Sequence, residues 1–375
     1  MCNHMDNNTL LFRPLLVGSL QLPNRLVRSA TAERLVLDTT DTPSPRLAAM
    51  YEAIARGGTG TIITGHVYVT SSGQCHNEMC SLADDAMIDH WRAIIAPSQA
   101  AGARVIAQIN HGGASCDQKL HSVRVSPSGV ATNQEGRSRA LTSGEIDATI
   151  AAFGAAARRA REAGFDGVQL HGAHGYLVSQ FLMQATNRRD DAWGGDATRR
   201  RAFLLAIIAE ARTQVGPDYP LWLKLGVAGT PSNGLPIEEG AAAAAASFAA
   251  GVDCIEISHA LGMPNNVNPT EPLLLPQAQA VRAACGLDAP LALVNGFRTR
   301  VAMEAVLASG VAQLVSLSRP LIAEPALGLN LQQGAERLLC TRCGRCWPTG
   351  LGAGIACNNP SVQKKVRART RTLGA

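Results

Sequence analysis

The stretch from Gly167 to Asp196 reads G-V-Q-L-H-G-A-H-G-Y-L-V-S-Q-F-L-M-Q-A-T-N-R-R-D-D-A-W-G-G-D, and the rest of the chain is organised around it. It begins with a short, mainly apolar run, Gly167–Leu170, which is typical of a buried strand. His171, His174 and Tyr176 follow directly. Two imidazole donors and a phenol at one strand end could hold an oxyanion and protonate the neighbouring carbon. The alternative is a pair of core histidines whose ring nitrogens are satisfied by backbone groups.

Strand candidates alternate with helical stretches on both sides of this run, which implies parallel strands with covering helices. The strands are expected at 25–30, 59–65, 103–109, 167–170, 221–225, 253–257, 291–295 and 313–317, and the helices at 46–56, 87–101, 143–163, 198–215, 236–250, 276–285 and 301–308. Eight such units over roughly 320 residues fit a (β/α)₈ TIM barrel with long loop insertions better than an open Rossmann sheet. No G-x-G-x-x-G motif opens a helix after a strand, which also disfavours a dinucleotide-binding domain.

The third of these helices has recognisable ends. Thr142 and Glu145 supply a capping hydroxyl and an early acid at its N-terminus, and Gly164 can adopt the left-handed conformation that ends a helix.

Composition narrows the class of protein. The 375 residues carry a formal net charge of +5 with no long basic block, so nucleic acid is not an expected partner. We find neither a signal peptide nor an apolar run of about eighteen residues, and therefore expect a soluble cytoplasmic protein without membrane contact. A homodimer is compatible with the sequence, which does not fix the oligomeric state.

Polar side chains at the predicted strand ends are informative, because barrel enzymes place their chemistry there. Gln108, His171 and Lys224 lie on successive strand ends, and a buried lysine needs a partner such as a bound anion. Loops after the last two strands commonly bind phosphate in this fold. Gly296 permits the backbone to approach a phosphate group closely there, and the Arg319 guanidinium supplies charged hydrogen-bond donors.

These residues belong to motifs that resemble the Old Yellow Enzyme family of FMN-dependent oxidoreductases. The resemblance runs from about Leu11 to Pro325 and is specific because several motifs occur together. They are L-F-R-P-L-L-V-G, L-P-N-R-L-V-R-S-A-T, A-Q-I-N-H-G-G, H-G-A-H-G-Y-L-V-S-Q-F-L, T-N-R-R-D-D-A-W-G-G-D and S-L-S-R-P-L-I-A-E-P.

The resemblance implies a role for each matching residue. His171 and His174 would bind the carbonyl oxygen of the substrate, and Tyr176 would protonate the α-carbon of the substrate. Lys224 would lie near flavin N1 and O2, and Gln108 would bond the flavin pyrimidine. The remaining cofactor-binding positions are Ser29, Ala30 and Thr31, the last two beside the flavin N5 and O4 edge, then Gly65 along the ring, and Gly296, Ser318 and Arg319 at the phosphate.

Ten cysteines are many for a cytosolic protein, and Cys340, Cys343, Cys346 and Cys357 cluster near the end. Close spacing in this setting favours metal or redox chemistry over a disulfide framework. The cluster resembles the iron–sulfur segment of the dienoyl-CoA reductase branch, although the spacings before its third and fourth cysteines are each one residue shorter. A [4Fe–4S] cluster, a zinc site and free thiols all remain open.

We therefore predict a single FMN-binding barrel over residues 1–335 and a cysteine-rich extension over 336–375 packed on it. The first functional hypothesis is an ene-reductase that uses FMN and NADH or NADPH on enone-type small molecules. Alternatives are a dienoyl-CoA reductase-like or demethylase-like flavin and iron–sulfur oxidoreductase, and a flavin-binding sensor with little turnover. Substrate shape is expected to depend on the 110–143 insertion and the 260–272 loop.

Overall fold

The computed structural model describes residues 9–37, 41–130, 137–229, 234–261 and 272–373. Most of the 260–272 loop, which was expected to shape the substrate site, therefore lies outside the described residues. Within them, no helix has the length and apolar character needed to cross a membrane.

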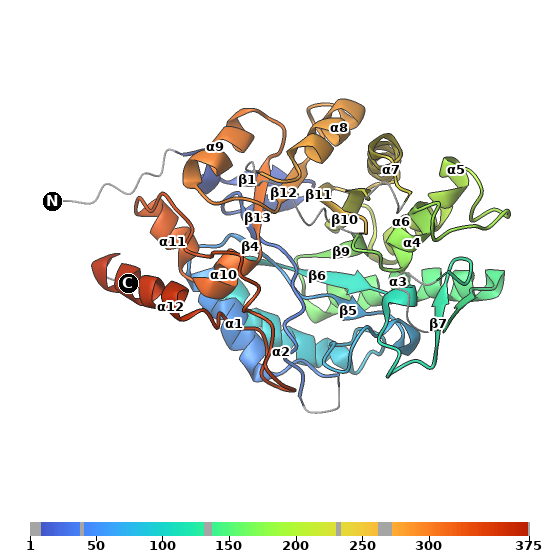
Figure 1. The fold of residues 1–375 in the computed structure, drawn as a ribbon, viewed down its shortest axis with the longest axis horizontal. Helices are drawn as coiled ribbons and strands as arrows, with labels where there is room; N and C mark the ends of the chain where they lie inside the picture. Colours follow the sequence, from blue (N-terminus) through green and yellow to red (C-terminus); the bar gives the residue numbers. More distant parts are fainter. Residues whose placement is uncertain (1–8, 38–40, 131–136, 230–233, 262–271, 374–375) are drawn as a thin grey trace.

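Eight parallel strands close into a barrel, which confirms the predicted TIM-barrel fold (Figure 1). Pairing between the second and third barrel strands, β4 and β6, completes the ring. Every strand overlaps its predicted segment because each is a short apolar run whose side chains can be buried on both faces. The barrel strands are β3 (Leu26–Arg28), β4 (Thr61–Ile63), β6 (Arg104–Asn110), β9 (Gly167–Gly172), β10 (Leu221–Ala228), β11 (Cys254–His259), β12 (Leu291–Val294) and β13 (Leu314–Leu317). A short additional strand, β5 (Val67–Tyr68), continues alongside β6.

Helices surround the barrel, each packing its buried side chains on the strands or on the next helix (Figure 1). The predicted helix over 198–215 is divided in two at Arg201, whose amide donates to the Thr198 carbonyl three residues back at 3.2 Å; the Asp196 side chain caps the first part by accepting from the amides of Thr198 and Arg199. The helices are α1 (Pro45–Arg56), α2 (Met87–Ala100), α3 (Ser143–Ala163), α4 (Leu177–Leu182), α5 (Ala197–Arg200), α6 (Ala202–Val215), α7 (Ile237–Ala249), α8 (Leu275–Cys285) and α9 (Arg300–Ala308).

Helix α3 has the predicted ends. The Thr142 hydroxyl accepts from the Glu145 amide while the Glu145 carboxylate accepts from the Thr142 amide, so two otherwise unpaired donors are satisfied. Gly164 follows with φ of 91°, a conformation that glycine adopts at little cost.

A hairpin that sequence analysis missed closes the N-terminal end of the barrel. Strands β1 (Leu15–Val17) and β2 (Leu20–Leu22) are antiparallel. Val17, Leu20 and Leu22 pack against side chains from inside the barrel, including Trp222 on β10. The barrel interior is thus a filled core, and a ligand can approach only from the opposite end. The 110–143 insertion, also expected to shape the substrate site, contains a short 3-10 turn, η3 (Gly113–Ser115), and a pair of strands, β7 (Val123–Ser126) and β8 (Arg137–Ala140).

The C-terminal residues lie against the barrel through backbone and ionic contacts. Helices α10 (Arg319–Ala323) and α11 (Leu327–Gln332) follow the last barrel strand, and α12 (Pro360–Leu373) ends the described chain. Arg369 on α12 pairs with the buried Glu324 at 2.9 Å. The Ile355 amide donates to the Glu33 carbonyl at 3.0 Å. The division of the chain at residue 335 stays a prediction.

Candidate active site

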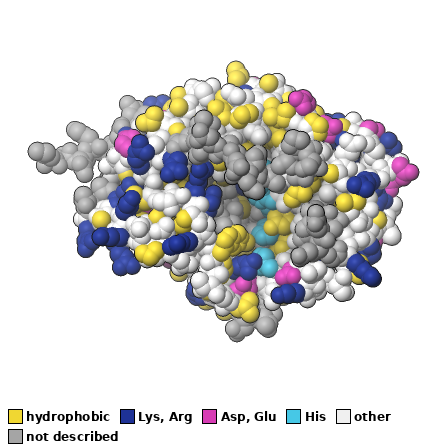
Figure 2. Space-filling model, viewed as in Figure 1, with side chains coloured by type: hydrophobic (Ala, Val, Ile, Leu, Met, Phe, Trp, Pro, Cys, Tyr) yellow, Lys and Arg dark blue, Asp and Glu magenta, His cyan; other side chains and the backbone are white. Residues whose placement is uncertain are grey.

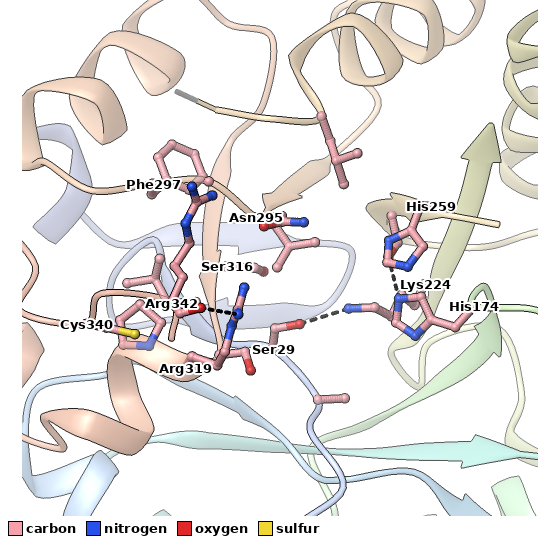
Figure 3. Close-up of a pocket in the computed structure, with 18 residues that line it drawn as sticks. Ser29, His174, Lys224, His259, Asn295, Phe297, Ser316, Arg319, Cys340 and Arg342 are labelled. Carbon is pink, nitrogen blue, oxygen red and sulfur yellow. Dashed lines mark hydrogen bonds between the residues drawn. The ribbon is translucent and has the colours of Figure 1, made fainter. Parts of the chain in front are cut away.

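A cavity of about 190 Å³ opens at the C-terminal ends of the barrel strands (Figure 3). It is lined by seven of the predicted catalytic and flavin-binding residues, namely Ser29, Ala30, His174, Lys224, Gly296, Ser318 and Arg319, and also by Cys340 of the predicted metal site. These seven residues come from five different strand ends. In the sequence they were linked only because each lies at or just after the end of a predicted strand. Thr31, Gln108, His171 and Tyr176 are connected to this cavity by the contacts described below, whereas Gly65 lines a separate small cavity.

Lys224 lies at the end of a chain of buried polar side chains that crosses the barrel. Its ammonium donates to Ser29 Oγ at 2.8 Å and to Glu256 Oε2 at 3.0 Å. Glu256 Oε2 also accepts from Gln169 Nε2 at 3.2 Å, and Gln169 Oε1 accepts from Gln108 Nε2 at 2.7 Å. Glu256 therefore compensates the charge of Lys224, which in the barrel would otherwise be costly.

Glu256 and Gln169 were missed in the sequence. Their signal is a polar side chain inside an otherwise apolar strand, the same signal that singled out Lys224.

A second buried network fixes the ends of β3 and β4. The Glu33 carboxylate pairs with Arg28 at 2.7 Å and accepts from Tyr51 at 2.6 Å. It also accepts from the Gly65 amide at 2.9 Å. A β-carbon at Gly65 would lie 1.9 Å from Glu33 Oε2, so only glycine fits against this carboxylate. Gly65 is thus required by packing whether or not it also contacts a cofactor.

The loops after β12 and β13 form one end of the cavity. Asn295 and Gly296 both have positive φ, of 79° and 98°. A β-carbon at Gly296 would lie 2.6 Å from the Leu273 amide nitrogen. The Ser318 hydroxyl is 2.7 Å from that of Thr31, which joins the last strand end to the first. Arg319 begins α10, and Figure 3 shows its side chain beside that of Arg342.

His171, His174 and Tyr176 lie together after β9. The His171 ring makes edge contacts with both others, with centroid separations of 5.0 Å to His174 and 4.8 Å to Tyr176. His171 Nδ1 accepts from the Ala173 amide at 3.3 Å, so in the neutral ring the proton lies on Nε2. His174 Nε2 is 2.8 Å from Ser258 Oγ. His171 therefore keeps a ring N–H that can be offered to a ligand.

Burial controls the protonation of these side chains. It holds the pKa of both His171 and His174 well below the usual value, and the neighbouring histidines and Lys224 lower both further. Burial likewise raises the pKa of the Tyr176 phenol well above 10, with smaller contributions from Cys75 and Cys116. At neutral pH the site thus has two neutral imidazoles and a phenol that keeps its proton.

Two further histidines extend this group. The His66 ring stacks on Tyr176 with centroids 5.1 Å apart, and the His259 ring lies 4.5 Å from that of His174. Burial lowers the pKa of His66 to about 3 and that of His259 to about 4. Figure 2 shows histidine side chains gathered along the floor of the central hollow. Their positions just after β4 and at the end of β11 could have identified them, because both follow predicted strands.

The four cysteines of the C-terminal segment line a second, much smaller cavity of about 20 Å³, which has room for about one water molecule. All four are free thiols. Across the described part of the chain, no three His, Cys, Asp or Glu side chains are arranged to hold a metal ion. The predicted iron–sulfur or zinc site at Cys340, Cys343, Cys346 and Cys357 is therefore not supported. Instead, Cys343 is exposed and accepts from Asn359 Nδ2 at 3.3 Å, and this bond is the main reason that its pKa falls to about 7.

Comparison with known proteins places this fold and site in context. Residues 10–337 match the family described as NADH:flavin oxidoreductase / NADH oxidase. A metal reductase of Desulforamulus reducens is 32% identical over 351 residues, which cover 90% of this chain and 51% of that protein. An NADH oxidase of Thermoanaerobacter brockii is 32% identical over 369 residues, covering 96% of this chain and 55% of the relative. The chain thus spans about half the length of these two relatives.

Solved structures agree on the fold. A 2-naphthoyl-CoA reductase in complex with 2-naphthoyl-CoA superposes with a TM-score of 0.86 at 24% identity, covering 97% of this chain and 58% of that one. An old yellow enzyme homologue from Zymomonas mobilis gives a TM-score of 0.75 at 24% identity, covering 88% of this chain and 95% of its own.

Proposed function

Because the chain belongs to the NADH:flavin oxidoreductase / NADH oxidase family, as its resemblance to the Old Yellow Enzymes predicts, we propose that it is an FMN-dependent oxidoreductase driven by NADH or NADPH. The reaction that we propose is reduction of the C=C bond of α,β-unsaturated carbonyl compounds and related activated alkenes. The observation that carries this proposal is the group His171, His174 and Tyr176, which combines neutral donors with a protonated acid beside the cavity.

The residues present fit FMN. Arg319 lies at one end of the cavity beside the turn at Gly296, as a phosphate group requires. Lys224 lies at the other end, near which the resemblance expects the flavin N1 and O2 atoms. When bound, FMN would supply the hydride that reduces the β-carbon of the substrate.

The imidazoles would stabilise the charge that appears on the substrate oxygen. His171 can donate its Nε2–H, because Nδ1 is already used as an acceptor. A neutral imidazole aimed at a developing enolate stabilises the transition state more than the uncharged substrate. His174 would be the second donor, with Ser258 orienting its ring.

Tyr176 would then transfer its proton to the α-carbon. A phenol is a weak acid, and the raised pKa of Tyr176 makes it weaker still, but the carbon of an enolate is basic enough to accept its proton. The raised pKa also keeps Tyr176 protonated throughout the physiological pH range, so the phenol always carries the proton that it would donate. A flavin-binding sensor would need no such group.

A simple experiment tests the function. The purified protein should be yellow, NADH or NADPH should bleach its absorption near ~450 nm under anaerobic conditions, and an enone such as cyclohexenone should restore the colour. Bleaching without recovery across a panel of enones and nitroalkenes would contradict ene-reduction and favour a sensor. Absence of bound or bindable FMN would contradict the whole proposal.

A further inference from the structure

We propose that Arg342, which lies in the cysteine-bearing segment, is a second arginine of the cofactor-phosphate site, so that this segment forms part of the FMN pocket. The inference rests on the proposed function, since it assigns a ligand to the same cavity. Nothing in the motifs of the barrel singles out Arg342. It follows the last barrel strand by 25 residues and reaches the cavity only through the fold.

The position of Arg342 is the first observation. Its side chain lines the main cavity together with Gly296 and Arg319. Its carbonyl accepts from Arg319 Nη1 at 3.5 Å, so the two arginines are held next to each other (Figure 3). In the same view the Arg342 guanidinium extends toward Phe297, which follows the glycine turn after β12. The cavity end that was assigned to phosphate therefore has two arginines around it.

Charge is the second observation. Lys224 also lines the cavity, but Glu256 offsets its charge at 3.0 Å. In the described part of the chain, neither Arg319 nor Arg342 has an acidic side chain within ion-pair distance. A phosphate monoester carries about −1.5 to −2 charges at neutral pH. Two unpaired guanidinium groups match this charge, whereas Arg319 alone would leave much of it uncompensated.

Backbone conformation is the third and independent observation. Five residues other than glycine have positive φ among the described ones, and three of them, His174, Asn295 and Arg342, line this one cavity. Arg342 has φ of 59°, a left-handed conformation that an arginine adopts only at a cost. Such residues concentrate at ligand sites, because the surrounding structure holds them there for a function. A purely structural turn at this position would be served better by glycine.

Flavin titration tests the inference. FMN and riboflavin, which differ by the phosphate, are titrated into full-length protein freed of flavin, and binding is followed by flavin fluorescence. Arg342→Gln should weaken FMN binding about 10- to 100-fold and change riboflavin binding by less than about threefold. Arg319→Gln should behave in the same way. Arg345→Gln is the matched control, because Arg345 is exposed on the same segment and lines the cysteine cavity but not the main one; this variant should bind both flavins like the wild type.

Arg342→Gly separates binding from structure. Glycine accepts the left-handed conformation, so this variant should lose FMN affinity as Arg342→Gln does while its flavin-free form melts no lower than the wild type. An equal loss of FMN and riboflavin, or a lower melting temperature for Arg342→Gly, would mean that Arg342 only maintains the segment. Wild-type FMN affinity in Arg342→Gln would overturn this inference alone, whereas a wild-type protein that binds neither flavin would overturn the proposed function with it.

Discussion

Replacing Glu256 by glutamine should destabilise the flavin-free protein strongly although the side chain keeps its shape. The Glu256 and Lys224 side chains are only 0% and 3% exposed, and their charged atoms lie 3.0 Å apart. Glu256→Gln removes the negative charge and leaves the ammonium buried, with only neutral acceptors beside it, the new amide oxygen and Ser29 Oγ at 2.8 Å.

The magnitude follows from this geometry. Two unit charges 3.0 Å apart attract by about 5 kcal/mol when the effective dielectric constant is about 20. Removing one partner of a buried pair typically costs about 3–5 kcal/mol, because the other charge stays buried without compensation. We expect a loss in this range for Glu256→Gln. The double variant Lys224→Met/Glu256→Gln should be more stable than the single variant, since no uncompensated charge remains.

Equilibrium urea unfolding, followed by far-UV circular dichroism on flavin-free protein, measures these differences. Glu52→Gln is a suitable control, because its partner Arg56 is 69% exposed and that pair should contribute less than about 1 kcal/mol. A loss of less than about 1 kcal/mol for Glu256→Gln would refute the reasoning. So would a double variant whose loss equals the sum of the two single losses, since that result would mean the charges do not interact.

Four other outcomes are expected. His171→Ala should slow enone reduction by the reduced enzyme by about 10²–10³-fold in stopped-flow measurements while reduction by NAD(P)H changes far less; an unchanged oxidative step would remove His171 from the site. Tyr176→Phe should slow enone reduction but spare nitroalkenes, whose anion is stable without a proton, so a parallel fall in both rates would indicate that Tyr176 only positions the substrate. Gly65→Ala should cost more than about 2 kcal/mol in urea unfolding, because the new methyl group would meet the Glu33 carboxylate at 1.9 Å; wild-type stability would show that this carboxylate moves freely. The free energy of unfolding should fall as the pH drops from about 6.5 toward 4, by up to about 1.4 kcal/mol per pH unit for each of His66 and His259. The reason is that the lowered pKa values of these two histidines keep the folded protein from taking up protons that the unfolded chain binds. Equal urea midpoints at pH 7 and pH 5 would contradict this.

Local sequence determined the fold to a large extent. Short apolar runs such as Gly167–Leu170 must be buried on both faces, and only a parallel sheet covered by helices can bury a regular series of them. Capping residues such as Thr142 and Gly164 act on their own backbone neighbours, so their effect could be read directly from the chain. The order of the barrel strands and most helix boundaries follow from such short-range rules, but the division of the predicted 198–215 helix and the β1–β2 hairpin did not.

The tertiary structure decided which polar residues meet. Lys224 was recognisable as a buried charge, but its partner Glu256 lies on the next strand, and only the register of β10 against β11 brings them together. Arg342 reaches the cavity because the C-terminal segment folds back over the last barrel strands. The four cysteines show the converse, since their spacing suggested a metal site but the described fold does not arrange them as ligands. Spacing along the chain fixes which residues are local neighbours, whereas contacts between distant residues depend on how strands and segments pack in three dimensions.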